Sequence, residues 1–365
     1  MSLFSKISLG ISREEIEEIL KSDIDINEKS SDGRTVLDVA CRFGNLELVK
    51  LLVRCPTINM NENNRGGASP FGIACQEGQL EVVKFLLTDE RVDVNHVTYE
   101  NVSPLFISCQ KDRVQIVKEL LKDPRVDVNL PRNMGATPLY IACAQGNFEI
   151  VTILLKMENI DVNKESIEGA TPLAISCQEG RVKIVELLIR DPRVDITKSS
   201  ETGITPFYVA CQKGYIEIVK MFLQDKRFHL NANTMLPLFI ISQDGHLEIL
   251  KWILAMGEDI HTTLMDSNNQ TPMDHALRFS TQGKQVWEKS DEEVEQRQKN
   301  CLQIYKLLQS YIQNPKDVQS KLRNELFISG FESFSLFFLF SYYFEWMDIY
   351  LFIYLFIYLF IYLFI

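Results

Sequence analysis

The spacing of apolar residues predicts pairs of short helices along most of this chain. In residues 148–155, Phe148-Glu-Ile-Val-Thr-Ile-Leu-Leu155, apolar residues recur at steps of three and four, as on a helix with one buried face. The preceding segment, Thr137-Pro-Leu-Tyr-Ile-Ala-Cys143, begins with a hydroxyl that can cap a helix and a proline whose φ suits the first turn. Gly146 lies between them, and glycine readily adopts the left-handed conformation that ends helices. The pattern therefore predicts two short antiparallel helices.

This two-helix pattern repeats at a constant step of 34 residues. Equivalent Ser-Pro or Thr-Pro pairs start at 69, 103, 137, 171 and 205, and Asp112 replaces the closing glycine of one unit. Aspartate is one of the few other residue types that tolerate the left-handed region. Six of the eight cysteines mark one position in successive units: Cys41, Cys75, Cys109, Cys143, Cys177 and Cys211. Units of this length bury a face only by stacking on the next unit, so the chain is predicted to be an all-α repeat solenoid.

The regular step makes the cysteines packing residues rather than a disulfide framework. Equivalent residues of stacked helices lie about 8–10 Å apart, whereas a disulfide needs Cα atoms within about 7 Å. Unpaired thiols indicate a reducing compartment. Redox sensing is the less favoured alternative, because an apolar setting raises the pKa of a thiol and blunts its reactivity.

Three blocks of the repeat are similar to those of a known family. They are Thr-Pro-Leu at 137–139 and 171–173, Gly146-Asn-Phe-Glu-Ile-Val151 with Leu154-Leu155, and Asp161-Val-Asn163. Because similar blocks recur from about residue 12 to residue 312, the chain resembles an ankyrin-repeat protein. The resemblance implies an array of paired antiparallel helices with β-hairpin-like finger loops that project at roughly right angles.

The chain departs from the family pattern in ways that matter for its structure. Its step is one residue longer than the usual 33, and the added residue falls where Asp-Pro-Arg follows the second helix, as at Asp123-Pro-Arg125. The family's histidine after Thr-Pro-Leu is absent, so its hydrogen bonding cannot be transferred. The seventh unit shortens its finger near residues 232–236 and carries Ser242 in place of cysteine.

The composition divides the chain into four segments. We expect an N-terminal capping half-repeat at 1–32, with its helix at 12–20, and an array of about eight units at 33–312. The last unit carries a charged insertion at 281–300 before a second helix at 302–308. Residues 313–330 are interpreted as a linker, and residues 331–365 as a low-complexity hydrophobic tail.

The tail allows three interpretations. The cyclic Tyr-Leu-Phe-Ile motif at 349–365 is what TATT repeat DNA encodes in every forward frame, so the segment can be a gene-model artefact. As a genuine segment, its 17 uncharged residues would form a tail-anchor helix of about 26 Å, slightly short of a bilayer core. As a strand, its alternating faces would favour cross-β aggregation.

Charge and residue spacing exclude several kinds of chemistry. The net charge of −11 argues against a nucleic-acid partner. The five histidines share no close spacing, so we expect no metal site, no cofactor and no catalytic centre. Asn95, Asn129 and Asn163 resemble the position that asparaginyl hydroxylases modify in this family, but hydrogen bonding to the finger backbone is the favoured role. The chain is therefore expected not to be an enzyme.

Function is expected to lie on exposed residues that differ between units. We predict a non-enzymatic scaffold that binds an unknown protein partner through its finger loops and concave helix face, as a cytoplasmic and monomeric array. The alternative is an adaptor tethered to a membrane through residues 349–365. Tyr99, Met134 and Ile167 are the predicted apolar anchors, and Phe106, Tyr140 and Tyr208 are expected to be partly buried between units. The remaining candidates are Asn64, Arg65, Glu100, Asn133, Glu168, Glu201 and Thr202.

Overall fold

The computed structural model describes residues 25–230, 235–257 and 260–327. The half-repeat helix expected at 12–20 and the tail at 331–365 lie outside these residues. The chain divides into two compact units, with the boundary in the sequence between His229 and Leu230. Each unit is described separately below.

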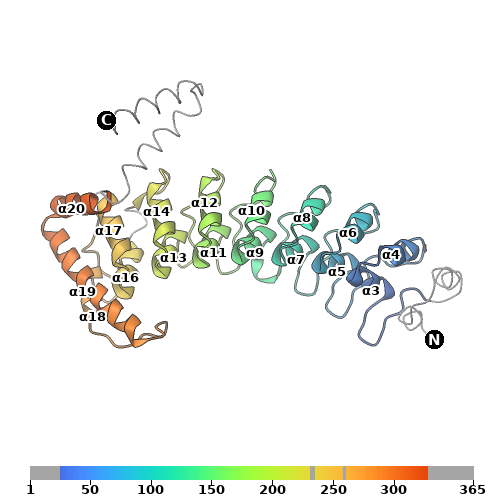
Figure 1. Cartoon of the computed structure of the whole chain (residues 1–365), viewed down its shortest axis with the longest axis horizontal. Helices are drawn as coiled ribbons and strands as arrows, with labels where there is room; N and C mark the ends of the chain where they lie inside the picture. Colours follow the sequence, from blue (N-terminus) through green and yellow to red (C-terminus); the bar gives the residue numbers. More distant parts are fainter. Residues whose placement is uncertain (1–24, 231–234, 258–259, 328–365) are drawn as a thin grey trace, which may run out of the picture. The chain divides into compact units, whose positions relative to one another are not determined.

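The described part of unit 1, residues 25–229, contains six pairs of helices. The first helices of the pairs pack on one another in one row and the second helices in another, as Figure 1 shows. The row of first helices is α3 (Val36–Phe43), α5 (Pro70–Glu77), α7 (Pro104–Gln110), α9 (Pro138–Gln145), α11 (Pro172–Gln178) and α13 (Pro206–Lys213). The row of second helices is α4 (Leu46–Val53), α6 (Leu80–Leu87), α8 (Val114–Leu120), α10 (Phe148–Leu154), α12 (Val182–Arg190) and α14 (Ile216–Gln224).

The predicted start and stop signals act as local chemistry requires. In each first helix the Ser or Thr side chain before the helix accepts a hydrogen bond from the backbone N–H three residues later, as Thr137 does from Tyr140 at 3.2 Å. Gly146 ends α9 in the left-handed conformation with φ 84°. Asp112 adopts the same region with φ 55°, which confirms its predicted role at the end of α7.

The core of unit 1 lies between the two rows of helices. The six regularly spaced cysteines are 0% exposed, and all are free thiols. Buried aliphatic side chains of the second helices, such as Ile150, Val151 and Leu154, complete each layer. Every layer therefore buries its apolar face against its neighbours, as a solenoid requires.

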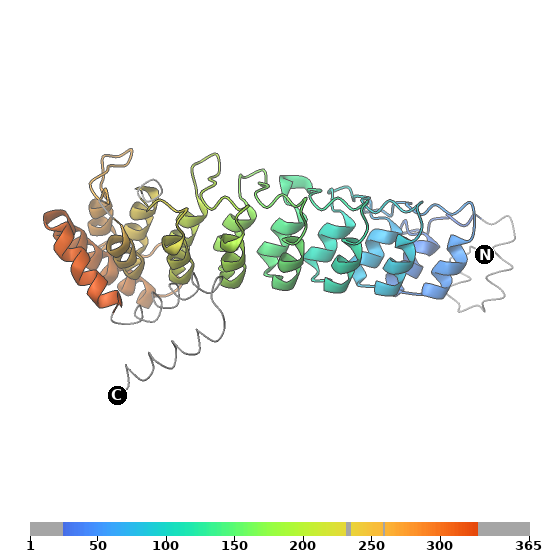
Figure 2. The same cartoon turned by 90° about the horizontal axis from the view of Figure 1, so that it is seen from above.

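The loops between repeats project to one side of unit 1 as fingers (Figure 2). The fingers are residues 30–34, 64–68, 98–102, 132–136, 166–170 and 200–204. Each is closed by a hydrogen bond from the N–H of its first residue to the carbonyl of its last, for example Arg132 to Ala136 at 2.9 Å. The described residues contain no β-strand, so the hairpin-like form rests on this closing contact. A short 3-10 turn, η1 (Asn133–Gly135), lies in one finger.

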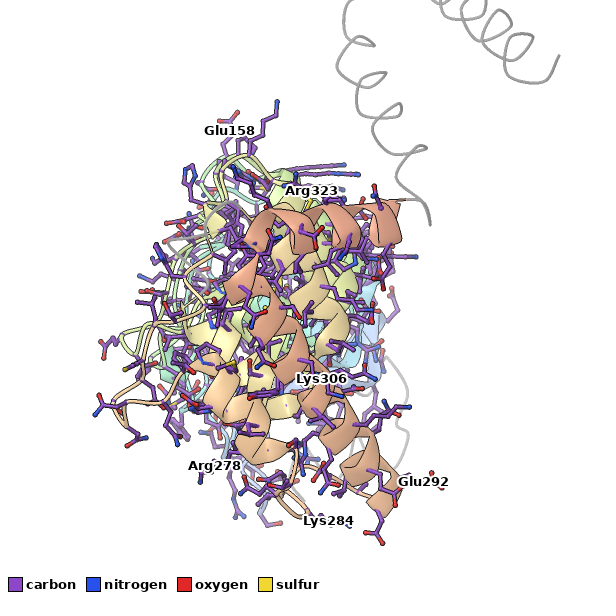
Figure 3. All side chains as sticks on the ribbon, turned by 90° about the vertical axis from the view of Figure 1, so that its left-hand side faces the viewer. Glu158, Arg278, Lys284, Glu292, Lys306 and Arg323 are labelled. Carbon is purple, nitrogen blue, oxygen red and sulfur yellow. The ribbon has the colours of Figure 1, made fainter. Side chains whose placement is uncertain are left out.

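Unit 2 contains α16 (Met235–Asp244), α17 (Leu247–Met256), α18 (Pro272–Phe279), α19 (Asp291–Gln313) and α20 (Pro315–Phe327). The second helix of the last repeat was expected at 302–308. It belongs instead to α19, a 23-residue helix that takes up the second half of the charged insertion. Ser290 caps α19, and acidic residues in its first turn favour its start. In Figure 3 the Glu292 side chain projects from this end of the helix.

The structure also differs from the linker expected at 313–330. Most of that segment is α20, which packs against α17 and α19. Val318, Leu322 and Leu326 recur every four residues along its buried face. Charged residues on the exposed face conceal this sparse stripe in the sequence. The segment thus covers the end of the repeats in unit 2.

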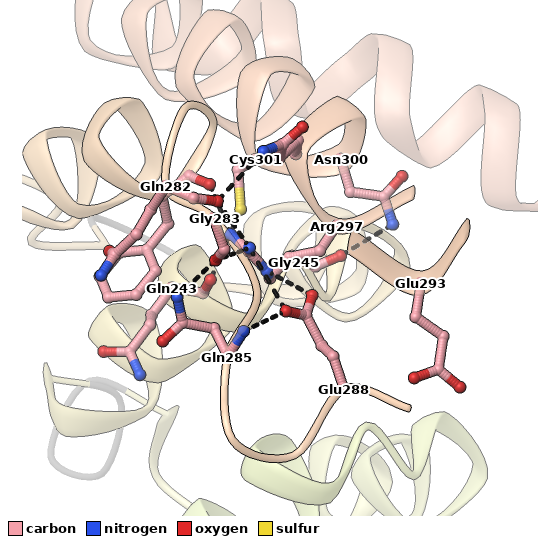
Figure 4. Close-up of polar contacts among 12 residues, drawn as sticks. Gln243, Gly245, Gln282, Gly283, Gln285, Glu288, Glu293, Arg297, Asn300 and Cys301 are labelled. Carbon is pink, nitrogen blue, oxygen red and sulfur yellow. Dashed lines mark hydrogen bonds and ion pairs between the residues drawn. The ribbon is translucent and has the colours of Figure 1, made fainter. Parts of the chain in front are cut away.

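The first half of the insertion, residues 281–290, is a loop fixed by one buried ion pair (Figure 4). Arg297 and Glu288 are 5% and 8% exposed, and the Arg297 Nε donates to the Glu288 carboxylate at 2.7 Å. The same guanidinium donates to the carbonyls of Phe279, Gln282 and Gly283 at 2.5, 2.9 and 3.0 Å. Glu288 in turn accepts from the backbone N–H of Gln285 at 2.5 Å. Arg297 therefore binds the first part of the loop through its carbonyls, and Glu288, its ion-pair partner, binds the later part.

Candidate protein-binding surface

Backbone hydrogen bonds join the tips of four consecutive fingers, from residues 64–68 to residues 166–170. Tyr99 N–H donates to the carbonyl of Gly66 at 3.3 Å, Asn133 N–H to that of Glu100 at 2.9 Å, and Ile167 N–H to that of Met134 at 2.8 Å. The tip residues of each of these fingers thus lie directly beside those of the preceding finger. We call the residues 99–100, 133–134, 167–168 and 201–202 the fingertip strip. Its first three tips are hydrogen-bonded in series, so they are fixed before any partner binds.

Three large apolar side chains of the fingertip strip face solvent. Tyr99 and Ile167 are each 70% exposed, and Met134 is 53% exposed. They come from three consecutive fingers. Apolar and aromatic side chains on a rigid frame are the usual anchors of protein interfaces.

Met134 also has an unusual backbone conformation. Its φ is 74°, a left-handed value that methionine rarely adopts. Gly169 and Asn101 match the next residue, Gly135, whose φ is also positive, whereas Glu100 and Glu168 at the position of Met134 in other fingers have no positive φ. Strained positions of this kind concentrate at functional sites.

The remaining fingertip residues are polar or acidic and exposed. Glu100, Glu168 and Glu201 carry the charges of the strip. In the described part of the chain no cation forms an ion pair with Glu168 or Glu201, and Arg132 reaches Glu100 only at 3.9 Å. Asn133 and Thr202 are also exposed, whereas Asn64 is half-buried and Arg65 is exposed on the preceding finger.

Among the aromatic candidates of the first helices, Phe106 is not available to a partner. It is 0% exposed, and the Arg132 guanidinium lies 5.7 Å from its ring centroid. Full burial under the next finger corrects the expectation of a partly buried contact residue. Tyr140 and Tyr208 are half-buried. Burial, followed by the nearby charge of Glu168, raises the pKa of Tyr140, which places this tyrosine beside the strip.

Asparagine side chains connect the bases of the fingers. Asn95 Nδ2 donates to the carbonyl of Arg125 at 2.7 Å, and its Oδ1 accepts from the N–H of Asp127 at 2.8 Å. Asn129 and Asn163 make the same pair of bonds to the following repeat. The geometry confirms that these amides bond the backbone, and it shows that each one spans two repeats.

The Asp-x-Arg residues that lengthen the repeat form a second connection. Arg125 is paired with Asp123 at 2.6 Å, and its guanidinium also donates to the Leu87 carbonyl of the preceding repeat at 3.0 Å. The Arg125 hydrogen bonds hold the pKa of Asp123 below its usual value. Arg91, Arg193 and Arg227 make equivalent contacts. These clamps satisfy carbonyls at the ends of the second helices α4, α6, α10 and α12.

Sequence reasoning missed several exposed apolar residues in unit 2. Val286 and Trp287, on the loop that Arg297 fixes, are 101% and 51% exposed. Met265 is 57% exposed on a finger of this unit. The sequence gives only a weak signal for the loop, since a single Val-Trp pair in a charged insertion has no periodicity.

Within the described ranges the chain shows no grouping of His, Cys, Asp and Glu side chains that could hold a metal ion. Burial raises the pKa of Cys143 to about 12 and that of Cys301 to about 11, so these thiols stay protonated at neutral pH. None of the described helices combines the length and apolar character needed to cross a bilayer. The tail on which the membrane alternative depends lies outside the described residues.

Comparison with known families gives one result. A family model described as ankyrin repeats (3 copies) matches residues 7–98, 71–166, 158–234 and 207–285. Together these stretches cover most of the chain. No curated protein sequence matches it.

Proposed function

Since the chain belongs to the ankyrin-repeat family, we propose that it is a non-enzymatic scaffold that binds a protein partner through the fingertip strip and the adjoining first-helix face. The observation that supports this most is the exposure of Tyr99, Met134 and Ile167 on three consecutive fingers. These side chains remain largely exposed to solvent in the folded chain. A partner that covered them would remove apolar surface from water, which is the main favourable term in association.

The rigid frame beneath the strip supports the same role. The backbone bonds between tips, the asparagine bridges and the Asp-x-Arg clamps fix the fingers before binding. A preorganised surface loses less conformational entropy when it binds. Half-buried Tyr140 and Tyr208 would border the contact on the first-helix side.

We also propose that the array acts as a monomer in the cytoplasm. The six regularly spaced thiols are buried and free, which suits a reducing compartment. Each repeat buries its apolar face on the next repeat, so the stack itself needs no second copy.

Site-specific photo-crosslinking in cells tests the proposed binding surface. A photoreactive amino acid would replace Tyr99 in one variant and Val182, which is 39% exposed on α12, in a matched control. We expect discrete crosslinked proteins from position 99 that are absent from position 182. Equal crosslinking at both positions, or none at position 99, would overturn the proposal.

A further inference from the structure

Two carboxylates lie near a single buried guanidinium in unit 2. Arg297 pairs with Glu288 at 2.7 Å and so fixes residues 281–290, which we call the insertion loop. Asp244, the last residue of α16, is attracted by the charge of Arg297 and repelled by that of Glu288. Gly245, which follows it, lies beside Arg297 (Figure 4), and a Cβ at Gly245 would be 3.3 Å from the Arg297 Cγ. The three charges therefore form one cluster where α16 packs on α19.

The Asp244 carboxylate lacks the contacts that a buried charge needs. Within the described residues its Oδ1 is buried and has no hydrogen-bond partner. Arg297 already donates to Glu288 and to three backbone carbonyls. Burial raises the pKa of Asp244 to about 6, and the Gln243 side chain and the charge of Arg297 offset this only in part. In the closed cluster Asp244 is therefore more stable with a proton than without one.

The other titratable side chains near this cluster lie on the helices that pack against α16. Cys301 of α19 is 0% exposed, and burial raises its pKa to about 11, so it stays neutral in the acidic and neutral range. His246 begins α17, and His275 of α18 bonds the Asp266 carboxylate at 2.9 Å. Histidine also changes its charge between pH 5 and 8. An effect of Asp244 must therefore be separated from theirs by a variant that removes its charge alone.

From this cluster we propose that unit 2 contains a pH-sensitive switch, in which a proton on Asp244 lets Arg297 and Glu288 hold the insertion loop closed. Once ionised, Asp244 competes with Glu288 for the guanidinium, and opening of the loop lets water reach the carboxylate. The loop carries Val286 and Trp287, which are 101% and 51% exposed. The proton on Asp244 thus determines how firmly this apolar pair is held. The switch lies in unit 2 and does not involve the fingertip strip.

Proton linkage fixes the direction of the pH effect. The pKa of Asp244 is about 6 with the loop closed, and opening returns it toward the value of about 3.9 for a hydrated aspartate. The closed form is therefore most favoured below pH 4, and it loses this advantage as the pH rises through 6. Between pH 5 and pH 7 the ratio of open to closed loop should rise about tenfold.

Hydrogen exchange in the full-length chain measures this opening. The Gln285 N–H donates to the Glu288 carboxylate at 2.5 Å, and the Glu288 N–H donates to the Gln285 carbonyl at 3.1 Å, so both amides report on the closed loop. After correction for the intrinsic effect of pH on exchange, their protection should fall about tenfold between pH 5 and pH 7. Equal protection at the two pH values, or greater protection at pH 7, would overturn the proposal.

Variants assign the effect to Asp244. Asp244→Asn removes the charge, so at pH 7 its loop should be protected at least as well as the native loop at pH 5. If this variant keeps the native tenfold change, other groups cause it and the proposal is wrong. Glu288→Gln removes the ion pair, so its loop should exchange fast at both pH values; native protection at pH 5 would also contradict the proposal. The control Asp317→Asn, which removes an exposed pair with Lys321 in α20, should keep the native pH dependence.

Discussion

The backbone conformation of Met134 at a fingertip costs free energy of folding. Met134 occupies a left-handed conformation at φ 74° while its side chain remains 53% exposed. Neither feature contributes to the core. Asn133, beside it, is held by the Glu100 carbonyl and by the Asn101 side chain at 2.9 Å. The finger therefore fixes its own strained residue through neighbours on the preceding finger.

Replacement of Met134 should separate stability from binding. Met134→Asn introduces a residue that tolerates the left-handed region, so the free energy of unfolding should rise by about 0.5–1 kcal/mol. Binding to a fingertip partner should fall because an apolar anchor is lost. Chemical denaturation measures the first effect. Met157→Asn, at a position with ordinary φ, serves as control and should not stabilise the chain.

Asp38 makes the stability of unit 1 depend on pH. It is 1% exposed in the first helix, where its carboxylate accepts from the Thr35 N–H at 2.8 Å. Burial raises the pKa of Asp38 to about 6, and the Thr35 hydrogen bonds offset this only in part. The folded state therefore binds a proton more readily than the unfolded state, whose aspartate pKa is about 3.9. Stability from this group is greatest below pH 4 and declines as the pH rises through 6.

Asp38→Asn should remove that dependence. Asparagine keeps an oxygen for the Thr35 N–H but carries no charge, so at pH 7 the free energy of unfolding should rise by up to about 2 kcal/mol. Near pH 4 the variant and the native chain should differ little. Denaturation curves at both pH values measure this. A variant less stable at pH 7 would show that the capping contact outweighs the burial of charge.

Between elements, the added Asp-x-Arg residues act across repeats. Each clamp joins the loop after one second helix to the end of the preceding second helix, 38 residues earlier, as Arg125 does at Leu87. The junction at Leu121 lacks it. Met157 and Asn159 stand where four other units have Asp and Arg, so no equivalent arginine is present for the Leu121 carbonyl. The stability of a repeat array is the sum of the stability of each repeat and of the contacts between neighbouring repeats. This junction therefore contributes less stability, because it lacks the clamp contact.

Installing the missing clamp should stabilise the array. Met157→Asp with Asn159→Arg should raise the free energy of unfolding by about 1 kcal/mol, the scale of a partly exposed charge-assisted contact. Arg125→Ala should lower it by a similar amount. Thermal or urea denaturation measures both. Lys122→Ala, which removes an exposed ion pair with Glu119 at the end of α8, is the control and should change little.

Helix α20 is an element that the sequence pattern alone does not reveal. The segment 313–330 has many charged residues and only three buried apolar ones in α20, so a linker was a natural interpretation. The apolar stripe of α20 stabilises the helix only because it packs against α17. Helix signals of this kind depend on tertiary packing more than on intrinsic propensity.

On the scale of the molecule, the two compact units use different devices for stability. Unit 1 repeats one layer with the same caps, thiols and bridges. Unit 2 departs from that plan through a long helix and a loop fixed by the buried Arg297–Glu288 pair. Removing one partner of a buried pair leaves an uncompensated charge, which is strongly destabilising.

Arg297→Ala should therefore destabilise unit 2 by about 3–5 kcal/mol. Hydrogen exchange should speed up in α18 and α19, whose carbonyls and loop the guanidinium holds, while exchange in α9 stays as in the native chain. Lys299→Ala, an exposed change on the same helix, is the control. Unchanged exchange in α18 would show that the loop does not depend on the ion pair.

The sequence by itself determined the repeat, the helix pairs with their caps and stops, the burial of the cysteines and the position of the fingers. Each of these rests on contacts within a few residues or on a pattern that every unit restates. Only the tertiary structure decided that Phe106 is covered by the following finger, that Tyr99, Met134 and Ile167 share one hydrogen-bonded strip, and that Arg297 fixes the insertion. These facts depend on contacts between residues many positions apart or unique to one unit, and no local pattern encodes them.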